Sequence, residues 1–261
     1  MSLAYLAEKI KQKKELRGLA DSFVEKELNE YIKRTNLSFP LNKKTEKKIC
    51  KAVRAELRNY TGQFQHLKQR EHLIQEGSYL ELLKTHASTR ERLPNYSVLK
   101  EIIANLKPRS ILDIGCGLNP IALASQGIFY YASDIKEDEL EIVSQFFKKE
   151  NIKGKVFYAD ARTERIWPKA DLCLLLKIVD LLDKKGHKKA EELIRSLNCK
   201  HIIVSFSTKT LSGRPMNHPQ RGWIERLCAR LGYKIKLVKT HNELFYLIID
   251  IPVDCVASAR E

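Results

Sequence analysis

The stretch Ser110-Ile111-Leu112-Asp113-Ile114-Gly115-Cys116-Gly117 decides the fold of this chain. Its first five residues form a mostly apolar run, which predicts a buried strand. Gly115 and Gly117 follow directly, and because glycine has no Cβ the backbone can turn tightly there and approach a ligand closely. In an open parallel sheet, ligands bind beyond the carboxyl ends of the strands. The stretch therefore predicts such a sheet, with a ligand at this turn.

Apolar runs and helical patterns alternate on both sides of this turn. Strands are predicted at 110–114, 129–133, 155–158, 171–176, 201–206, 234–238 and 244–249, and helices at 98–106, 121–126, 140–149, 188–197 and 222–231. Such alternation predicts an α/β fold in which helices cover both faces of a mostly parallel, Rossmann-like sheet.

Three aspartates are predicted to follow successive strands. Asp134 lies 21 residues after Asp113, where an acidic side chain can accept hydrogen bonds from both hydroxyls of a ribose. Asp160, between Ala159 and Ala161, follows the next strand and could border an adenine. We expect the three to converge on one crevice. The alternative is that each of them caps the N-terminus of a helix.

The identity of the cofactor is inferred from a glycine that this turn lacks. A dinucleotide site of the form G-x-G-x-x-G would need glycine at position 120, where this chain has Pro120. Because the turn lacks the glycine motif that binds a pyrophosphate, S-adenosylmethionine is a better candidate than NAD. The late pair of strands also suits the class I methyltransferase form of the Rossmann-like sheet, preceded here by an N-terminal helical domain.

The charge of the chain favours a polyanionic partner. Its formal net charge is +15, and residues 1–100 carry 21 Lys and Arg against 12 Asp and Glu. Basic side chains attract nucleic acid, and binding releases counterions from the phosphates. An ordinary Lys-rich surface remains the alternative, and composition does not separate RNA from DNA.

Residues 1–85 show a helical period, interrupted at 36–42 around Pro40. Around the helix that carries Ile49, Val53 and Leu57, seven Lys and Arg residues are distributed between positions 43 and 58. We expect a basic helical RNA-docking domain at 1–85 and a methyltransferase domain at 86–261. The alternative is that the helices only pack on each other and expose solvated charge.

The remaining composition predicts a soluble, cytoplasmic protein. The six cysteines are scattered singly, without Cys-x-x-Cys pairs, which argues against a zinc site and for a reducing compartment. We expect no metal, and packed cysteines such as Cys173. No apolar stretch is long enough for a membrane span, and the Lys-rich start is unlike a signal peptide. A monomer is the expected form.

Several motifs in matching order resemble the aminoglycoside-resistance 16S ribosomal RNA methyltransferases. The matching stretches are His86–Leu93, Leu112–Pro120, Leu174–Lys177, Val204–Phe206, Leu211–Arg214 and Asn242–Leu247. The resemblance implies methylation of a guanine N7 in 16S rRNA of the small ribosomal subunit, by a resistance enzyme or a housekeeping relative. Over the first 80 residues the resemblance is limited to the presence of a basic helical extension.

The resemblance also implies roles for individual residues. Arg90 would pair with the methionine carboxylate of the cofactor, a charge-assisted contact, and Lys177 would be the catalytic residue, facing the target base or its phosphate. The other implied cofactor contacts are Gly115, Asp134, Ile135, Asp160, Ala161 and Leu176. Lys177 could instead be a solvated lysine, and Arg90 and Arg92 could form structural salt bridges.

The target nucleotide would have to leave its stack to be methylated. Lys209 and Arg214 are the expected phosphate contacts, and Trp223 the expected stacking residue, with His218 and Phe206 as alternatives; packing or solvation is the competing interpretation of each. The segment 214–224 departs from the family pattern except at Trp223. Because this loop should receive the nucleotide, the identity of the base stays open.

Guanine N7 has a free lone pair and no proton to lose, so its methylation needs positioning rather than a general base. The chain accordingly has no Asn-Pro-Pro-Tyr motif, which is typical of amine methylation. Competing hypotheses are methylation of another RNA such as tRNA, methylation of a small molecule, a non-catalytic RNA-binding relative, and an NAD enzyme.

Overall fold

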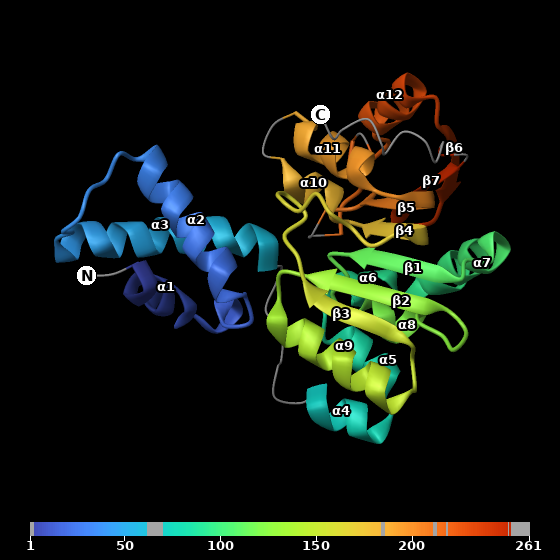
Figure 1. Ribbon diagram of the computed structural model, residues 1–261, viewed down its shortest axis with the longest axis horizontal. Coiled ribbons are helices and arrows are strands. Elements are labelled where there is room, and N and C mark those ends of the chain that lie inside the picture. Colours follow the sequence, from blue (N-terminus) through green and yellow to red (C-terminus); the bar gives the residue numbers. More distant parts are fainter. Residues whose placement is uncertain are drawn as a thin grey trace.

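A computed structural model describes residues 3–61, 70–183, 186–210, 213–217, 219–249 and 251 of the chain. Its centre is a seven-stranded sheet in the order β3-β2-β1-β4-β5-β7-β6 (Figure 1). The strands are β1 Ser110–Ile114, β2 Phe129–Asp134, β3 Gly154–Tyr158, β4 Ala170–Leu176, β5 Cys199–Ser207, β6 Lys234–Lys239 and β7 Glu243–Ile249. The first five are parallel, and β7 pairs antiparallel with both β5 and β6.

Successive side chains of the central strands enter two different cores. Leu172, Leu174 and Leu176 of β4 pack in one core, whereas Cys173 and Leu175 pack in the other. Because both faces are buried, β4 is apolar from Leu172 to Leu176 instead of alternating with polar residues.

Helices cover both faces of the sheet. The first core is closed by α4 Arg70–Glu76, α5 Tyr79–Lys84, α7 Tyr96–Leu106, α8 Asn119–Leu123 and α9 Glu137–Lys149; the second is closed by α10 Val179–Leu182, α11 Lys188–Ser196 and α12 Gly222–Leu231. The short helix α6 Ala87–Arg92 leads into α7. The predicted fold class, a Rossmann-like α/β sheet, is confirmed. Every predicted strand lies within two residues of an observed one, whereas the helix expected at 121–126 begins earlier, with Pro120 in its first turn.

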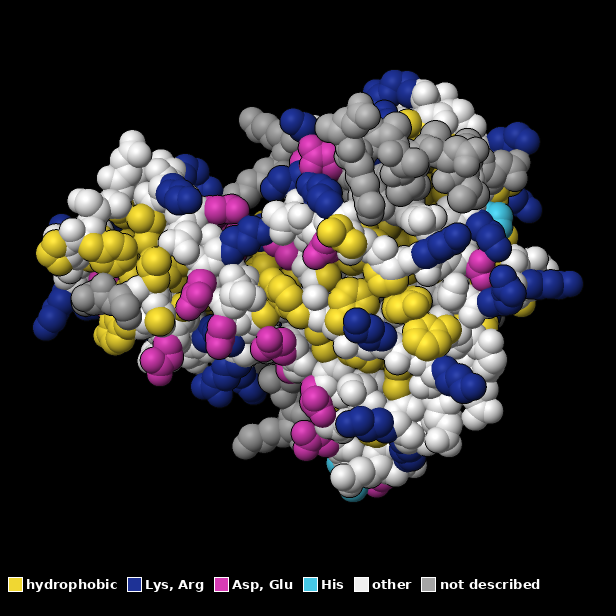
Figure 2. Space-filling view, viewed as in Figure 1, with side chains coloured by type: hydrophobic (Ala, Val, Ile, Leu, Met, Phe, Trp, Pro, Cys, Tyr) yellow, Lys and Arg dark blue, Asp and Glu magenta, His cyan; other side chains and the backbone are white. Residues whose placement is uncertain are grey.

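The N-terminal helices form a separate lobe at one end of the sheet (Figure 1). They are α1 Leu3–Lys11, the 3₁₀ turn η1 Lys14–Leu16, α2 Asp21–Arg34 and α3 Lys43–Thr61. The lobe has its own core, which includes Leu6, Phe23 and Val53. Lys and Arg side chains are spread over both parts of the face shown in Figure 2, interspersed with acidic ones.

The boundary expected at residue 85 falls too late in the chain. Ile74 of α4 and Leu82 and Leu83 of α5 pack in the core that also contains Leu99, against the sheet. Among the described residues, the N-terminal core contains those up to α3, and Ile135, which directly follows β2, packs against it. A helical period identifies a helix but does not specify its packing partner, so α4 and α5 were assigned to the wrong part.

Candidate cofactor and RNA site

A cavity of about 830 Å³ lies at the carboxyl ends of the parallel strands. The strand order places its lining residues in sequence along this edge: Asp160 after β3, Asp134 at the end of β2, Gly115 after β1, Lys177 after β4 and Lys209 after β5. Gly115 lies at the switch point between β1 and β4, where ligands of open α/β sheets bind.

The glycine turn has the geometry that its sequence predicts. Gly115 and Gly117 have φ angles of +66° and +48°, in the left-handed region that favours glycine. A Cβ on Gly115 would lie 2.3 Å from Cδ1 of Ile178, and one on Gly117 would lie 2.9 Å from Cε1 of His86. Larger residues would therefore strain this wall of the cavity and reduce its space.

Asp134 is fixed by backbone amides on the cavity wall. Its Oδ2 accepts a hydrogen bond from the Gly117 amide at 2.9 Å, and its Oδ1 accepts from the amides of Ile135 at 2.7 Å and Lys136 at 3.1 Å. Burial raises the pKa of Asp134 to about 6. Since a carboxylate has about four acceptor positions, it can still accept a hydrogen bond from a ribose.

Asp113 does not join the cavity, contrary to the expected convergence of three aspartates. Its side chain is fully buried, and Oδ2 accepts a hydrogen bond from the Tyr130 hydroxyl at 2.8 Å. Asp113 lies inside β1, one residue before the strand ends, whereas Asp134 is the last residue of β2. Burial raises the pKa of Asp113 to about 7.

Asp160 lines the cavity, but its carboxylate is already paired. Arg162 donates to both oxygens, at 3.0 and 2.9 Å, and Lys26 of α2 donates to Oδ2 at 2.8 Å. Burial opposes ionisation, yet these two cations lower the pKa of Asp160 to about 2. Asp160 therefore holds this wall in place, while Ala161 and Ala159 provide apolar surface beside it.

A buried charged cluster supports the glycine turn, and the sequence analysis missed it. Glu139 of α9 is fully buried, within 3.3 Å of His86 and 3.8 Å of Arg70, and it also pairs with Lys136. Burial works against its ionisation, and the three neighbours outweigh burial, lowering the pKa of Glu139 to about 2. Only the presence of His86 in a matching stretch pointed to this cluster.

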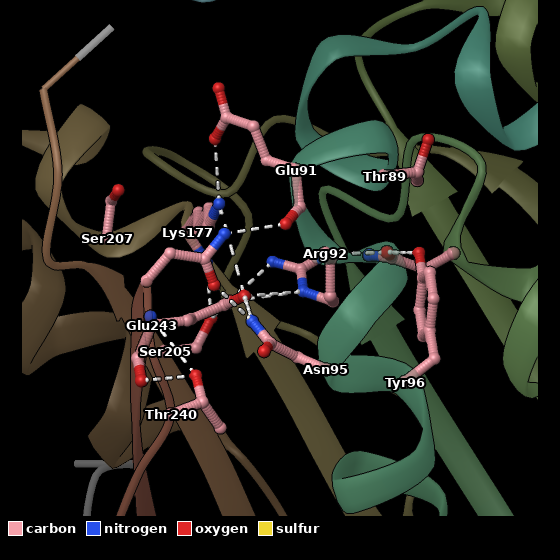
Figure 3. A network of polar contacts seen from close by, with 12 residues as sticks. Thr89, Glu91, Arg92, Asn95, Tyr96, Lys177, Ser205, Ser207, Thr240 and Glu243 are labelled. Atoms are coloured by element: carbon pink, nitrogen blue, oxygen red, sulfur yellow. Dashed lines mark hydrogen bonds and ion pairs between the residues drawn. The ribbon is translucent and has the colours of Figure 1, made fainter. Parts of the chain in front are cut away.

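Lys177 is held in an unusual backbone conformation beside a buried network (Figure 3). Its φ is +60°, which is uncommon for a residue with a side chain, and its amide donates to the Ser205 carbonyl at 3.1 Å. The Lys177 ammonium lies 2.9 Å from a Glu91 oxygen and 4.0 Å from Glu243. Strained residues of this kind cluster at functional sites.

Arg90 and Arg92 lie on different sides of α6. Arg90 is exposed and is not among the residues that line the cavity, so the expected contact with the methionine carboxylate has no basis in this conformation. Arg92 is fully buried and forms a salt bridge with Glu243 at 2.8 Å, the structural alternative. Residues two apart in a helix point in nearly opposite directions, which explains the separation.

The expected RNA contacts divide between the cavity and the surface. Lys209 lines the cavity, and Arg214 is exposed in the adjacent turn. Trp223 does not line the cavity, because its ring stacks on His187 at a centroid distance of 4.2 Å and meets the edge of Phe206. Phe206 is buried. His218, Leu211 and Ser212 lie outside the described residues.

The remaining cofactor residues expected from the sequence border the same cavity. Gly115, Asp134, Ile135, Asp160, Ala161 and Leu176 all line it, together with Lys177. A family model described as ribosomal RNA methyltransferase (FmrO) matches residues 75–247. The chain belongs to this family.

Two relatives of this ribosomal RNA methyltransferase carry one and the same name. It is 32% identical over 214 residues to the 16S rRNA (guanine(1405)-N(7))-methyltransferase of Serratia marcescens, covering 78% of this chain and 84% of that protein. It is 30% identical to the protein of the same name from Frankia casuarinae, covering 64% of this chain and 62% of that one.

Solved structures agree with this assignment. The 16S rRNA methyltransferase RmtF in complex with S-adenosyl-L-homocysteine superposes with a TM-score of 0.81 at 26% identity, covering 95% of this chain and 99% of that one. The 16S rRNA methylase RmtB gives 0.76 at 27% identity, covering 96% and 99%. Among the described residues, none of the helices could span a bilayer, and no group of side chains is suited to hold a metal.

Proposed function

We propose that this methyltransferase transfers the methyl group of S-adenosylmethionine to N7 of a guanine in 16S rRNA of the small ribosomal subunit. One observation carries the proposal: the residues suited to an adenosine and those suited to a nucleotide line a single cavity, in order along one sheet edge. The names of the relatives specify the atom and the RNA.

The residues after β1, β2 and β3 fit the cofactor. Asp134 offers acceptors to the ribose, Ala161 borders the adenine position, and Gly115 leaves room for the methionine part. The cofactor supplies an electrophilic methyl group. The protein contributes alignment of the guanine with that group, because N7 needs no base to become a nucleophile.

Lys177 and Lys209, after β4 and β5, are the proposed contacts to the nucleotide. The Lys177 ammonium is balanced by Glu91 and Glu243, so its position is fixed before RNA binds. We assign it an orienting role toward the base or its phosphate. Arg214, exposed in the adjacent turn, is placed to contact the RNA backbone. The nucleotide would enter without stacking on Trp223.

The N-terminal lobe is the proposed RNA-docking part. Four exposed lysines (Lys44, Lys47, Lys48 and Lys51) lie on the side of α3 opposite Ile49, Val53 and Leu57, which are buried. We further propose that the protein acts as a monomer in the cytoplasm, where small subunits reside, and that the modification protects the ribosome from aminoglycosides.

The test is to incubate the protein with labelled S-adenosylmethionine and, in separate reactions, purified small subunits or tRNA, and then to map the modified nucleotide. We expect one N7-methylguanine in 16S rRNA and none in tRNA. Asp134→Ala should abolish binding of S-adenosylhomocysteine in calorimetry, whereas Asp171→Ala, remote from the cavity at the start of β4, should not. Label in tRNA alone would reject the proposed substrate.

A further inference from the structure

The cavity has a wall that does not come from the methyltransferase sheet. Phe23 of α2 and Tyr60 of α3 line it together with Asp134 and Asp160. The carboxyl ends of β2 and β3 point toward these N-terminal helices (Figure 1). The adenosine side of the cavity therefore lies at the junction between the two parts of the molecule.

Backbone hydrogen bonds connect the two parts directly beside Asp134. The Ala20 amide donates to the Ile135 carbonyl at 3.1 Å, and the Glu137 amide donates to the Gly18 carbonyl at 2.8 Å. The Ile135 side chain packs against the N-terminal core. The residues that follow Asp134 are thus held from outside the sheet.

Arg162 makes the corresponding connection after β3. Its guanidinium lies 4.7 Å from the ring centroids of both Phe23 and Tyr60. Its Nη1 lies 2.7 Å from a Glu27 oxygen, and its Nε and Nη2 donate hydrogen bonds to the two carboxylate oxygens of Asp160. The side chain is only 7% exposed. A buried guanidinium is tolerated when ion pairs and hydrogen bonds offset its desolvation. Here Asp160 and Glu27 are its counter-ions, and the Tyr60 hydroxyl accepts a further hydrogen bond at 3.1 Å.

We propose that Arg162 is a positioning residue for the cofactor, which fixes the Asp160–Ala161 wall against the N-terminal helices and so makes those helices part of the cofactor site. The inference rests on the proposed function, since it assumes that the cavity binds the cofactor. Arg162 itself acts through Asp160, with Lys26 supporting the same carboxylate from α2.

A linkage between the two ligands follows from this arrangement. The helices that close the cofactor cavity also carry the surface proposed to dock on RNA. If docking orders the junction, the small subunit tightens cofactor binding, and by reciprocity the cofactor tightens subunit binding by the same factor. Arg162 contacts α2, α3 and the cavity wall, so it is placed to transmit this effect.

The first experiment compares Arg162→Met with Arg165→Met in the full-length protein. Arg165 belongs to the same loop but is 40% exposed and pairs with Glu192 at 2.6 Å, away from the cavity. We expect Arg162→Met to raise the Kd for S-adenosylhomocysteine by about tenfold or more, since it removes the guanidinium from between the buried carboxylates of Asp160 and Glu27. Arg165→Met should leave that Kd unchanged, and Arg162→Lys should restore part of the affinity.

Kinetics separate positioning from general instability. Arg162→Met should raise the KM for the cofactor while kcat at saturating cofactor stays within about threefold of the wild type. A variant that was only partly folded would instead lose kcat in proportion to its folded fraction, which circular dichroism measures. The small subunit should lower the Kd of the wild type for S-adenosylhomocysteine, and should not lower that of Arg162→Met.

A second variant disturbs the junction from a site outside the cavity. A Cβ on Gly18 would lie 2.1 Å from the carboxyl carbon of Asp138, and neither residue lines the cavity. Gly18→Ala therefore requires that the Asp138 carboxyl group or the N-terminal helices move, and we expect movement of the helices to weaken cofactor binding. Asp138→Ala removes the obstacle, so the double variant Gly18→Ala with Asp138→Ala should regain affinity.

The inference is overturned if folded Arg162→Met and Gly18→Ala bind S-adenosylhomocysteine as tightly as the wild type. That result would leave the proposed function intact, because the wild type would still bind the cofactor and methylate small subunits. A wild type that binds no cofactor, or methylates no RNA, would refute the proposed function instead.

Discussion

At the residue scale, the carboxyl group of Asp134 controls how the cofactor site responds to pH. Burial raises its pKa to about 6, so the carboxyl group becomes protonated at a higher pH than an ordinary aspartate does. A protonated carboxyl group loses the negative charge that favours accepting a hydrogen bond from a ribose hydroxyl. With a pKa near 6, about nine-tenths is ionised at pH 7 and about one-tenth at pH 5.

We therefore expect the affinity for S-adenosylhomocysteine to fall several-fold, up to about tenfold, between pH 7 and pH 5. Titration of Asp134 does not cause unfolding over this range of pH. Because folding raises the pKa of Asp134, its protonation between pH 7 and pH 5 stabilises the folded state relative to the unfolded state. Calorimetry between pH 5 and 8 measures the effect. Asp113→Asn should keep this pH dependence, since Asp113 lies outside the cavity; a flat profile in the wild type would contradict the role of Asp134.

Single residues also show the limits of sequence reasoning. The ends of β1 and β2 could be located from apolar runs, but whether Asp113 or Asp134 faces the ligand depends on one residue of register. Arg90 and Arg92 stand in one motif, yet only Arg92 is buried. Arg162 could not be found at all, because its partners Glu27 and Tyr60 lie more than 100 residues away in the sequence.

At the scale of elements, one buried ion pair joins α6 to the sheet. Glu243, at the start of β7, accepts hydrogen bonds from Arg92 at 2.8 Å and from the Ser205 hydroxyl of β5 at 2.6 Å (Figure 3). Arg92 also donates to Asn119 of α8 at 2.7 Å. This network thus connects α6, α8, β5 and β7 next to Lys177, at the carboxyl edge of the sheet.

Glu243→Gln should lower the free energy of unfolding by about 3 kcal/mol, because it leaves the Arg92 charge buried without its counter-ion. Urea unfolding at pH 7 measures this. Glu81→Gln, which removes an exposed pair with Lys84, should cost under about 1 kcal/mol. Burial opposes ionisation of Glu243, and Arg92 and Lys177 outweigh it to lower the pKa, so its contribution is present at neutral pH and is lost on acidification below about pH 4.5. Equal costs for the two variants would disprove the role of the buried pair.

Helices and strands were predicted well where an apolar run or an apolar period specifies them, as in β1, whose observed bounds are those expected. The assignment of elements to parts was less accurate. The helical periods of α3 and α5 look alike in sequence, but Leu57 packs in the N-terminal core and Leu82 against the sheet. Tertiary packing decides such cases, and it depends on residues far away in the chain.

At the scale of the whole molecule, the effect of the net charge of +15 on RNA binding depends on where the basic side chains lie. Lys44, Lys47 and Lys51 recur at helical spacing and are all exposed on α3. This helix belongs to the N-terminal lobe (Figure 1), whose residues Phe23 and Tyr60 line the cavity. Cations arranged in this way can follow a phosphate backbone. Their function, unlike that of the cavity, is electrostatic and should therefore depend on salt.

Replacing these three lysines with glutamate should weaken binding to the small subunit and reduce the slope of log affinity against log salt by about 2 to 3, since each phosphate contact contributes about 0.7 to 0.9. The Kd for S-adenosylhomocysteine without RNA should not change, because none of the three lines the cavity. The control carries the same charge change at Lys100, Lys107 and Lys236, on or beside α7 and β6, at the opposite end of the molecule. If the control loses as much affinity and slope, binding reflects net charge alone, and α3 is not a docking surface.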